Sequence, residues 1–127
     1  MPKEYSKTIL GIDPGTNLLG YGVVSVDNNG PKFVDMGVLD LRKEKDAYRK
    51  LGLIYEKISW LIDYYEPSAV ACESPFYGKN AQVILKLGRA QGAAITAAAT
   101  FTKARSYGVF TAKQSAATAL LPLREKF

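Results

Sequence analysis

Apolar and polar positions follow two different periods along this chain, and each period predicts one kind of element. Three short apolar runs, each ended by turn residues, predict β-strands over residues 8–13, 21–26 and 32–41. A proline–glycine pair stops the first run, and a polar turn at residues 27–30 ends the second. Because consecutive strands joined by short turns pair with each other, we expect an antiparallel meander.

A helical period follows the third run. Large apolar residues recur at three- and four-residue spacing over residues 46–65, which predicts an amphipathic helix with one buried stripe. The members of this stripe are Leu51, Ile54, Ile58, Leu61, Ile62 and Tyr65. Pro67 ends the helix, and residues 68–73 have the pattern of a fourth strand. A helix between two strands permits a crossover, so we expect residues 68–73 to lie parallel to residues 8–13.

A second helix is predicted over residues 80–99, and its many alanines and glycines indicate close approach to a neighbouring element. Residues 107–110 resemble a fifth strand. The order βββαβαβ predicts an α/β protein with a five-stranded mixed sheet flanked by helices. We see no repeat, linker or domain boundary, so residues 1–127 are interpreted as a single domain.

Composition fits an ordinary globular protein, with 47% apolar and 23% charged residues. The longest tract of small apolar residues, 92–99, is too short to be a membrane span, and the N-terminal residues lack the apolar core of a signal peptide. The single cysteine, Cys72, excludes an internal disulfide. We therefore expect a reducing, cytoplasmic location.

Charge is distributed unevenly. Residues 1–73 hold nine Lys/Arg against eleven Asp/Glu, whereas residues 74–127 hold eight Lys/Arg against Glu125 alone. This asymmetry favours a surface for an anionic partner, and nucleic acid is the partner that we infer from it. A solvated basic surface without a partner is the other interpretation that charge alone leaves open.

Two carboxylates occupy equivalent positions in this pattern. Asp13 closes the first strand, Glu73 closes the fourth, and a proline follows closely after each. If these strands are parallel neighbours, the two carboxylates lie at the same end of the sheet. Hard oxygen ligands suit Mg²⁺ or Mn²⁺, which keep several waters and take further ligands from a phosphate.

Cations and aromatic residues follow Glu73 in the sequence. Phe76 and Tyr77 lie three and four residues after it, where a ring can stack on or wedge beside a base. Six of the eight cations of this part are Lys79, Lys86, Arg89, Lys103, Arg105 and Lys113. A metal, phosphate-binding cations and an aromatic residue at one rim suggest phosphodiester hydrolysis.

Taken singly, each of these residues also has an ordinary structural interpretation. Asp13 can anchor the following turn through backbone hydrogen bonds, Glu73 can pair with a lysine, and Phe76 can pack into the core. The functional interpretation depends on their joint placement.

Several of these motifs together resemble the RuvC family of crossover-junction endodeoxyribonucleases. Residues 10–16 (LGIDPGT), with GYGVV at residues 20–24, resemble the opening of that family. Residues 73–80 (ESPFYGKN) resemble its second acidic motif, and residues 86–92 (KLGRAQG) match the helix that follows. The similarity runs from about residue 9 to about residue 115.

The resemblance implies a ribonuclease H-like fold and a homodimer that resolves four-way Holliday junctions by paired nicks. It implies Mg²⁺ held by four acidic residues, with Asp13 as the first ligand and Glu73 as the second, and Mn²⁺ as a substitute. A branch-migration helicase complex is the partner that it suggests. The residues expected to contact DNA are Phe76, Tyr77, Lys79, Asn80, Lys86, Arg89 and Lys113.

The chain departs from the family pattern after Ser115. The family continues with a glycine-rich segment, a helix and a closely spaced aspartate pair, whereas Glu125 is the only acid here after Glu73. We therefore interpret residues 1–127 as a ribonuclease H-like domain that is either incomplete at its C-terminus or divergent in its last dozen residues. Whether the chain cuts in the form given is an open question at this point.

Two other functions stay open at this point. A DNA-binding module that recognises junctions without cutting them fits the missing acids. An actin-like or sugar-kinase-like ATPase shares the Gly-Ile-Asp-x-Gly-Thr pattern, whose glycines let backbone amides approach phosphates. ATP in those proteins is clamped between two domains, and 127 residues supply one.

Overall fold

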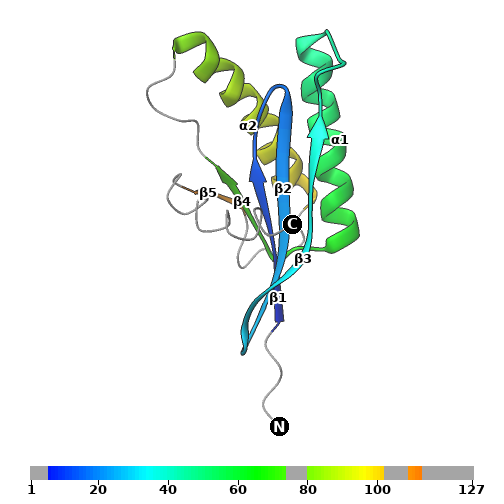
Figure 1. The fold of residues 1–127 in the computed structure, drawn as a ribbon, viewed down its shortest axis with the longest axis vertical. Helices are drawn as coiled ribbons and strands as arrows, with labels where there is room; N and C mark the ends of the chain where they lie inside the picture. The colour runs from blue at the N-terminus through cyan, green and yellow to red at the C-terminus, as the bar shows by residue number, and fades with distance from the viewer. Residues whose placement is uncertain (1–5, 74–79, 102–108, 113–127) are drawn as a thin grey trace.

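The computed structural model describes residues 6–73, 80–101 and 109–112. Within them the chain forms a mixed sheet with two helices (Figure 1). The elements are β1 (Ser6–Asp13), β2 (Leu18–Asp27), β3 (Gly30–Asp40), α1 (Ala47–Tyr65), β4 (Ala69–Glu73), α2 (Ala81–Phe101) and β5 (Val109–Ala112). The predicted α/β class and the order of the elements are confirmed.

The strands of the described residues are arranged in the order β3-β2-β1-β4-β5. β1 pairs antiparallel with β2, and β2 pairs antiparallel with β3, so the predicted meander is confirmed. β1 pairs parallel with β4, with Ile12 opposite Cys72, and β4 pairs parallel with β5. The predicted crossover through α1 therefore brings the fourth strand against the first.

Three strands begin earlier than the sequence pattern predicted, and β1 is the first of them, since it starts at Ser6 and not at residue 8. β2 starts at Leu18, three residues before the predicted start, because Leu19 is fully buried and Leu18 pairs with Asp40 of β3. β3 starts at Gly30, directly after a two-residue turn in which the Asn29 backbone N–H donates to the Asp27 carboxylate at 2.8 Å. Of the predicted strand at residues 107–110, the first two lie outside the described residues.

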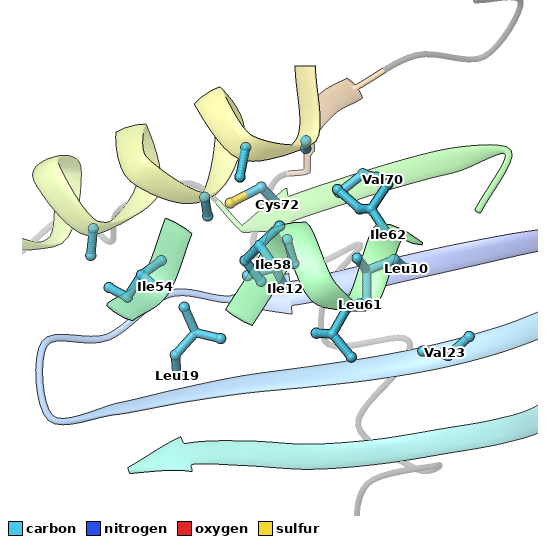
Figure 2. Close-up of a cluster of buried hydrophobic side chains, with 14 of the residues drawn as sticks. Leu10, Ile12, Leu19, Val23, Ile54, Ile58, Leu61, Ile62, Val70 and Cys72 are labelled. Carbon is cyan, nitrogen blue, oxygen red and sulfur yellow. The ribbon is translucent and has the colours of Figure 1, made fainter. Parts of the chain in front are cut away.

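The hydrophobic core lies between one face of the sheet and both helices. Figure 2 shows side chains from β1, β2 and β4 directed toward those of α1. The strands supply Leu10, Ile12, Leu19, Val23, Val70 and Cys72, and α1 supplies Ile54, Ile58, Leu61 and Ile62. Among the described side chains, those that α2 contributes to the buried cluster are alanines, so it can pack closely there.

Helix α1 has defined ends. The Asp46 carboxylate accepts hydrogen bonds from the backbone N–H groups of Tyr48 and Arg49, at 2.8 and 3.2 Å, which caps the N-terminus. Glu66 ends the helix in the left-handed conformation, with φ 47°, and its N–H donates to the Ile62 carbonyl. Because a short connection joins Asp40 of β3 to Ala47, the helix begins at the end of the sheet where β3 finishes.

The exposed side of α1 carries an aromatic ridge toward its C-terminal end. We use this name for the rings of Trp60 and Tyr64 together with the Lys57 side chain, whose ammonium lies over the Trp60 ring. The rings of Trp60 and Tyr64 stack with centroids 5.0 Å apart, and the Lys57 ammonium lies 5.0 Å from the Trp60 centroid. Trp60 is 52% exposed. Such a cation–π contact at an exposed site contributes about 0.5–1 kcal/mol.

Neither helix in the described part of the chain is long and apolar enough to cross a membrane.

Candidate metal site and nucleic-acid interface

Asp13 and Glu73 are the last residues of two adjacent parallel strands. The register pairs Ile12 with Cys72, so the next residue on each strand is one of the two carboxylates. Neighbouring strands lie about 4.8 Å apart, and side chains alternate between faces. Because Ile12 and Cys72 face the helices, Asp13 and Glu73 are directed to the opposite face. Both residues are partly exposed.

The Cys72 thiol lies close enough to both carboxylates for their charges to affect its pKa. Burial raises its pKa to about 12, and the negative charges of Glu73 and Asp13 add to this increase. The side chain is fully buried in the core. Cys72 therefore stays a neutral thiol near pH 7, and it is neither a nucleophile nor a metal ligand in that state.

Gly15 shapes the turn that follows Asp13. A Cβ atom at this position would overlap the backbone carbonyl of Leu18. The overlap is with main-chain atoms, which a rotamer change cannot relieve. Glycine is therefore required for the tight turn that carries the chain from β1 into β2 next to the carboxylate pair.

Gln91 links helix α2 to the end of β4. Its side-chain Nε2 donates a hydrogen bond to the backbone carbonyl of Glu73 at 3.0 Å. Sequence reasoning assigned no role to this residue, although it is a polar side chain among the alanines of α2. The bond fixes the main chain that carries the Glu73 side chain.

The structure describes three of the seven residues predicted to contact DNA. The Asn80 carbonyl Oδ1 accepts from the backbone N–H of Val83 at 2.9 Å, so Asn80 caps the start of α2. Lys86 and Arg89 lie exposed on the first half of the same helix. Phe76, Tyr77, Lys79 and Lys113 lie outside the described residues, as do Lys103 and Arg105.

The donor set at the strand ends fits a hard divalent cation. Two carboxylates on adjacent strands offer the oxygen ligands that Mg²⁺ and Mn²⁺ prefer, and water and phosphate oxygens complete their coordination. No group of three or more acidic, histidine or cysteine side chains arranged for a metal occurs among the described residues. Asp13 and Glu73 thus form a two-carboxylate site, and their roles as ligands stay predictions.

A meander followed by a parallel fourth strand, with carboxylates closing the first and fourth strands, defines a ribonuclease H-like α/β protein. The family model described as crossover junction endodeoxyribonuclease RuvC matches residues 9–120. The chain belongs to the RuvC family, so the resemblance deduced from the sequence motifs is confirmed.

Relatives from two bacteria share about half of their aligned residues with this chain. The RuvC of Christiangramia forsetii is 53% identical over 91 residues, which cover 72% of this chain and 47% of the relative. The RuvC of Bacteroides fragilis is 52% identical over 92 residues, which cover 72% of this chain and 49% of the relative. The chain therefore spans about half the length of the curated relatives it matches.

A solved structure supports the fold. Thermus thermophilus RuvC in complex with a Holliday junction substrate matches with a TM-score of 0.72 and 26% identity. The match covers 84% of this chain and 64% of that protein. The sheet and both helices therefore follow the RuvC architecture.

Proposed function

We propose that this chain carries part of a structure-selective endonuclease that resolves four-way DNA junctions by metal-dependent phosphodiester hydrolysis. One observation supports this most directly. In a chain of the RuvC family, Asp13 and Glu73 end adjacent parallel strands whose register makes them neighbours. The actin-like ATPase interpretation has no comparable support.

Asp13 and Glu73 would hold the metal, for which Mg²⁺ is the proposed ion and Mn²⁺ a substitute. A bound divalent ion supplies water activation and stabilisation of the leaving oxygen. The protein's own residues set the positions of the ligands. The Gly15 turn directs the chain away after Asp13, and Gln91 holds the main chain of Glu73.

Contacts with DNA are proposed for the cations and rings that follow Glu73. Lys86 and Arg89 would attract the phosphate backbone, and Asn80 lies at the start of their helix. The same proposal covers Phe76, Tyr77, Lys79 and Lys113. We further propose that the protein forms a homodimer and cooperates with a branch-migration helicase complex. The proposal also includes a single domain and a cytoplasmic location.

The test is the variant Asp13→Asn, compared with the parent chain and with Asp63→Asn, which changes an exposed carboxylate of α1. If the parent cuts a four-way junction in Mg²⁺, this cutting should fall by more than about a hundredfold in Asp13→Asn, because even residues that only orient a metal ligand cost about 10–100-fold. Junction binding in EDTA or Ca²⁺ should persist. Asp63→Asn should cut like the parent.

Circular dichroism of the same variants separates the roles of Asp13. If Asp13→Asn is unfolded, the side chain anchors the turn and the metal proposal loses its main support. Equal cutting by a folded Asp13→Asn and the parent would contradict the proposal directly.

A junction-binding module that does not cut is the second candidate. It is favoured by the described part of the site, in which Asp13 and Glu73 are two carboxylates and no group of three or more metal-ligating side chains occurs. Two carboxylates leave a two-metal centre short of protein ligands. Mg²⁺-dependent cutting by this 127-residue chain would exclude this candidate, and binding without cutting would favour it.

A further inference from the structure

A cavity of ≈ 220 Å³ opens between α1, α2 and the turn that joins β1 to β2. α1 and α2 lie against each other (Figure 1), and the cavity lies near their N-terminal halves. Its polar lining consists of Thr16, Asn17, Tyr48, Lys50, Lys86 and Arg89. Only Lys86 and Arg89 were predicted from the sequence to contact DNA.

Three of the lining residues are cations, and they come from two different helices. Lys50 belongs to the first turn of α1, whereas Lys86 and Arg89 belong to α2. None of the described lining residues is acidic. The nearby Asp46 carboxylate accepts hydrogen bonds from the first turn of α1. Because like charges repel, this arrangement favours an anion between the two helices.

Asn17 fixes the cavity wall. Its backbone carbonyl accepts a hydrogen bond from the Leu41 N–H at 2.7 Å, which attaches the turn to the end of β3. Its side-chain Oδ1 accepts from the Lys50 ammonium at 3.3 Å. The turn and the lysine are therefore held together before any ligand arrives, which reduces the entropy lost on binding.

The cavity and the carboxylate pair share one segment of chain. Thr16 and Asn17 follow Asp13 by three and four residues. Both helices begin at the end of the sheet where Asp13 and Glu73 lie, and helix N-terminal ends favour negative charge. A polyanion that reaches the carboxylate pair thus has a cationic cavity close by on the helix side.

We propose that this cavity binds a backbone phosphate of a DNA arm next to the scissile site, with Lys50 as its central cation. The inference rests on the proposed junction-binding function and extends it to a site on α1 and the β1–β2 turn. Lys50, Lys86 and Arg89 neutralise the phosphate, and the hydroxyl groups of Thr16 and Tyr48 donate hydrogen bonds to its oxygens.

The first experiment measures affinity for a four-way junction in EDTA at several salt concentrations. The variants are Lys50→Ala, Lys50→Arg and the control Lys32→Ala, which lies in the β2–β3 hairpin at the opposite end of the sheet. Lys50→Ala should weaken binding about fivefold and reduce the salt slope by about one, because each neutralised phosphate contributes ~0.9 to that slope. Lys50→Arg and Lys32→Ala should bind like the parent.

If the parent binds in a salt-dependent way and Lys50→Ala binds identically, the cavity proposal is wrong and junction binding stands. If the parent fails to bind the junction at any salt concentration, the proposed function fails and the DNA assignment of the cavity fails with it. These two failures are distinguishable in one titration.

A second experiment follows the backbone amides by NMR while inorganic phosphate is added to the full chain. Shifts at Thr16, Asn17 and Lys50 that disappear in Lys50→Ala support an anion site in this cavity. Chemical-shift changes confined to other residues would contradict an anion site in this cavity. Phosphate binding in the cavity combined with unchanged junction affinity of Lys50→Ala would overturn the DNA assignment in favour of a free anion.

Discussion

Gly15 is a residue whose lack of a side chain has a measurable consequence. Replacing it with alanine brings a Cβ atom into the Leu18 carbonyl, so the turn beside Asp13 must deform. We expect Gly15→Ala to lower the free energy of unfolding by about 1–3 kcal/mol, as measured by urea denaturation. It should also reduce junction cutting in a chain that cuts.

Gly22→Ala is the matched control, because a Cβ atom there would meet no heavy atom within 4 Å. Its unfolding curve should lie close to that of the parent. If both alanine variants are equally stable, the turn at Gly15 adapts without cost and the steric argument fails.

Tyr65 and Asp35 link α1 to the edge strand β3. The Tyr65 hydroxyl donates to the Asp35 carboxylate, and this bond, together with burial and the nearby negative charge, raises the pKa of Tyr65 to about 12. The protonated phenol is the donor, so the bond stabilises the fold fully below pH 10 and its contribution is lost as the pH rises toward 12.

The stability difference between the parent and Tyr65→Phe should therefore shrink above pH 10, as followed by urea unfolding at a series of pH values. Tyr64→Phe is the control, since Tyr64 is exposed and stacks on Trp60 through its ring. A difference for Tyr65→Phe that stays constant from pH 7 to beyond pH 11 would contradict this assignment.

The N-terminal cap of α1 stabilises the helical turn that carries Lys50. Asp46→Ala removes an acceptor for two backbone N–H groups, so we expect a loss of about 1 kcal/mol in thermal or urea unfolding. Asp63→Ala changes an exposed carboxylate in the last turn of the same helix, away from the cap, and should have an effect within about 0.5 kcal/mol. Equal losses in both variants would argue for a general charge effect.

The strands and helices were predictable where hydrophobic periods were long. The apolar stripe of α1, between the apolar runs of β1 and β4, predicted a crossover connection. That connection in turn predicted that Asp13 and Glu73 are neighbours. The start of β2 was missed because Pro14, Gly15 and Asn17 have the composition of a loop, whereas pairing with β3 extends the strand to Leu18.

The contact between Lys50 and Asn17 was not predictable from local pattern. These residues are 33 positions apart, and their contact depends on where α1 lies relative to the β1–β2 turn. That placement follows from packing of the whole helix against the sheet. The hydrogen bond from Gln91 to the Glu73 carbonyl has the same origin, because it depends on how closely the alanine-rich face of α2 approaches β4.

Metal binding should stabilise the molecule as a whole if Asp13 and Glu73 hold a cation. A ligand that binds only the native state raises the unfolding free energy; with about 10 mM Mg²⁺ and a dissociation constant of about 1 mM, the gain is about 1.4 kcal/mol. We expect the melting temperature to rise with Mg²⁺ in the parent and not in Asp13→Asn. EDTA should reverse the rise. An equal rise in both chains would indicate metal binding elsewhere.

The aromatic ridge on α1 has a spectroscopic consequence. Trp60 is the only tryptophan of the chain, and it lies toward the C-terminal end of α1, whereas that helix begins at the end of the sheet that carries Asp13 and Glu73. The Tyr64 ring stacks on its indole and the Lys57 ammonium lies 5.0 Å from the ring centroid, so we expect a change at either neighbour to alter its emission. The molecule thus contains an intrinsic fluorophore remote from the carboxylates. Quenching of that fluorophore during a DNA titration would report a second contact surface or self-association, separately from occupancy of the strand ends.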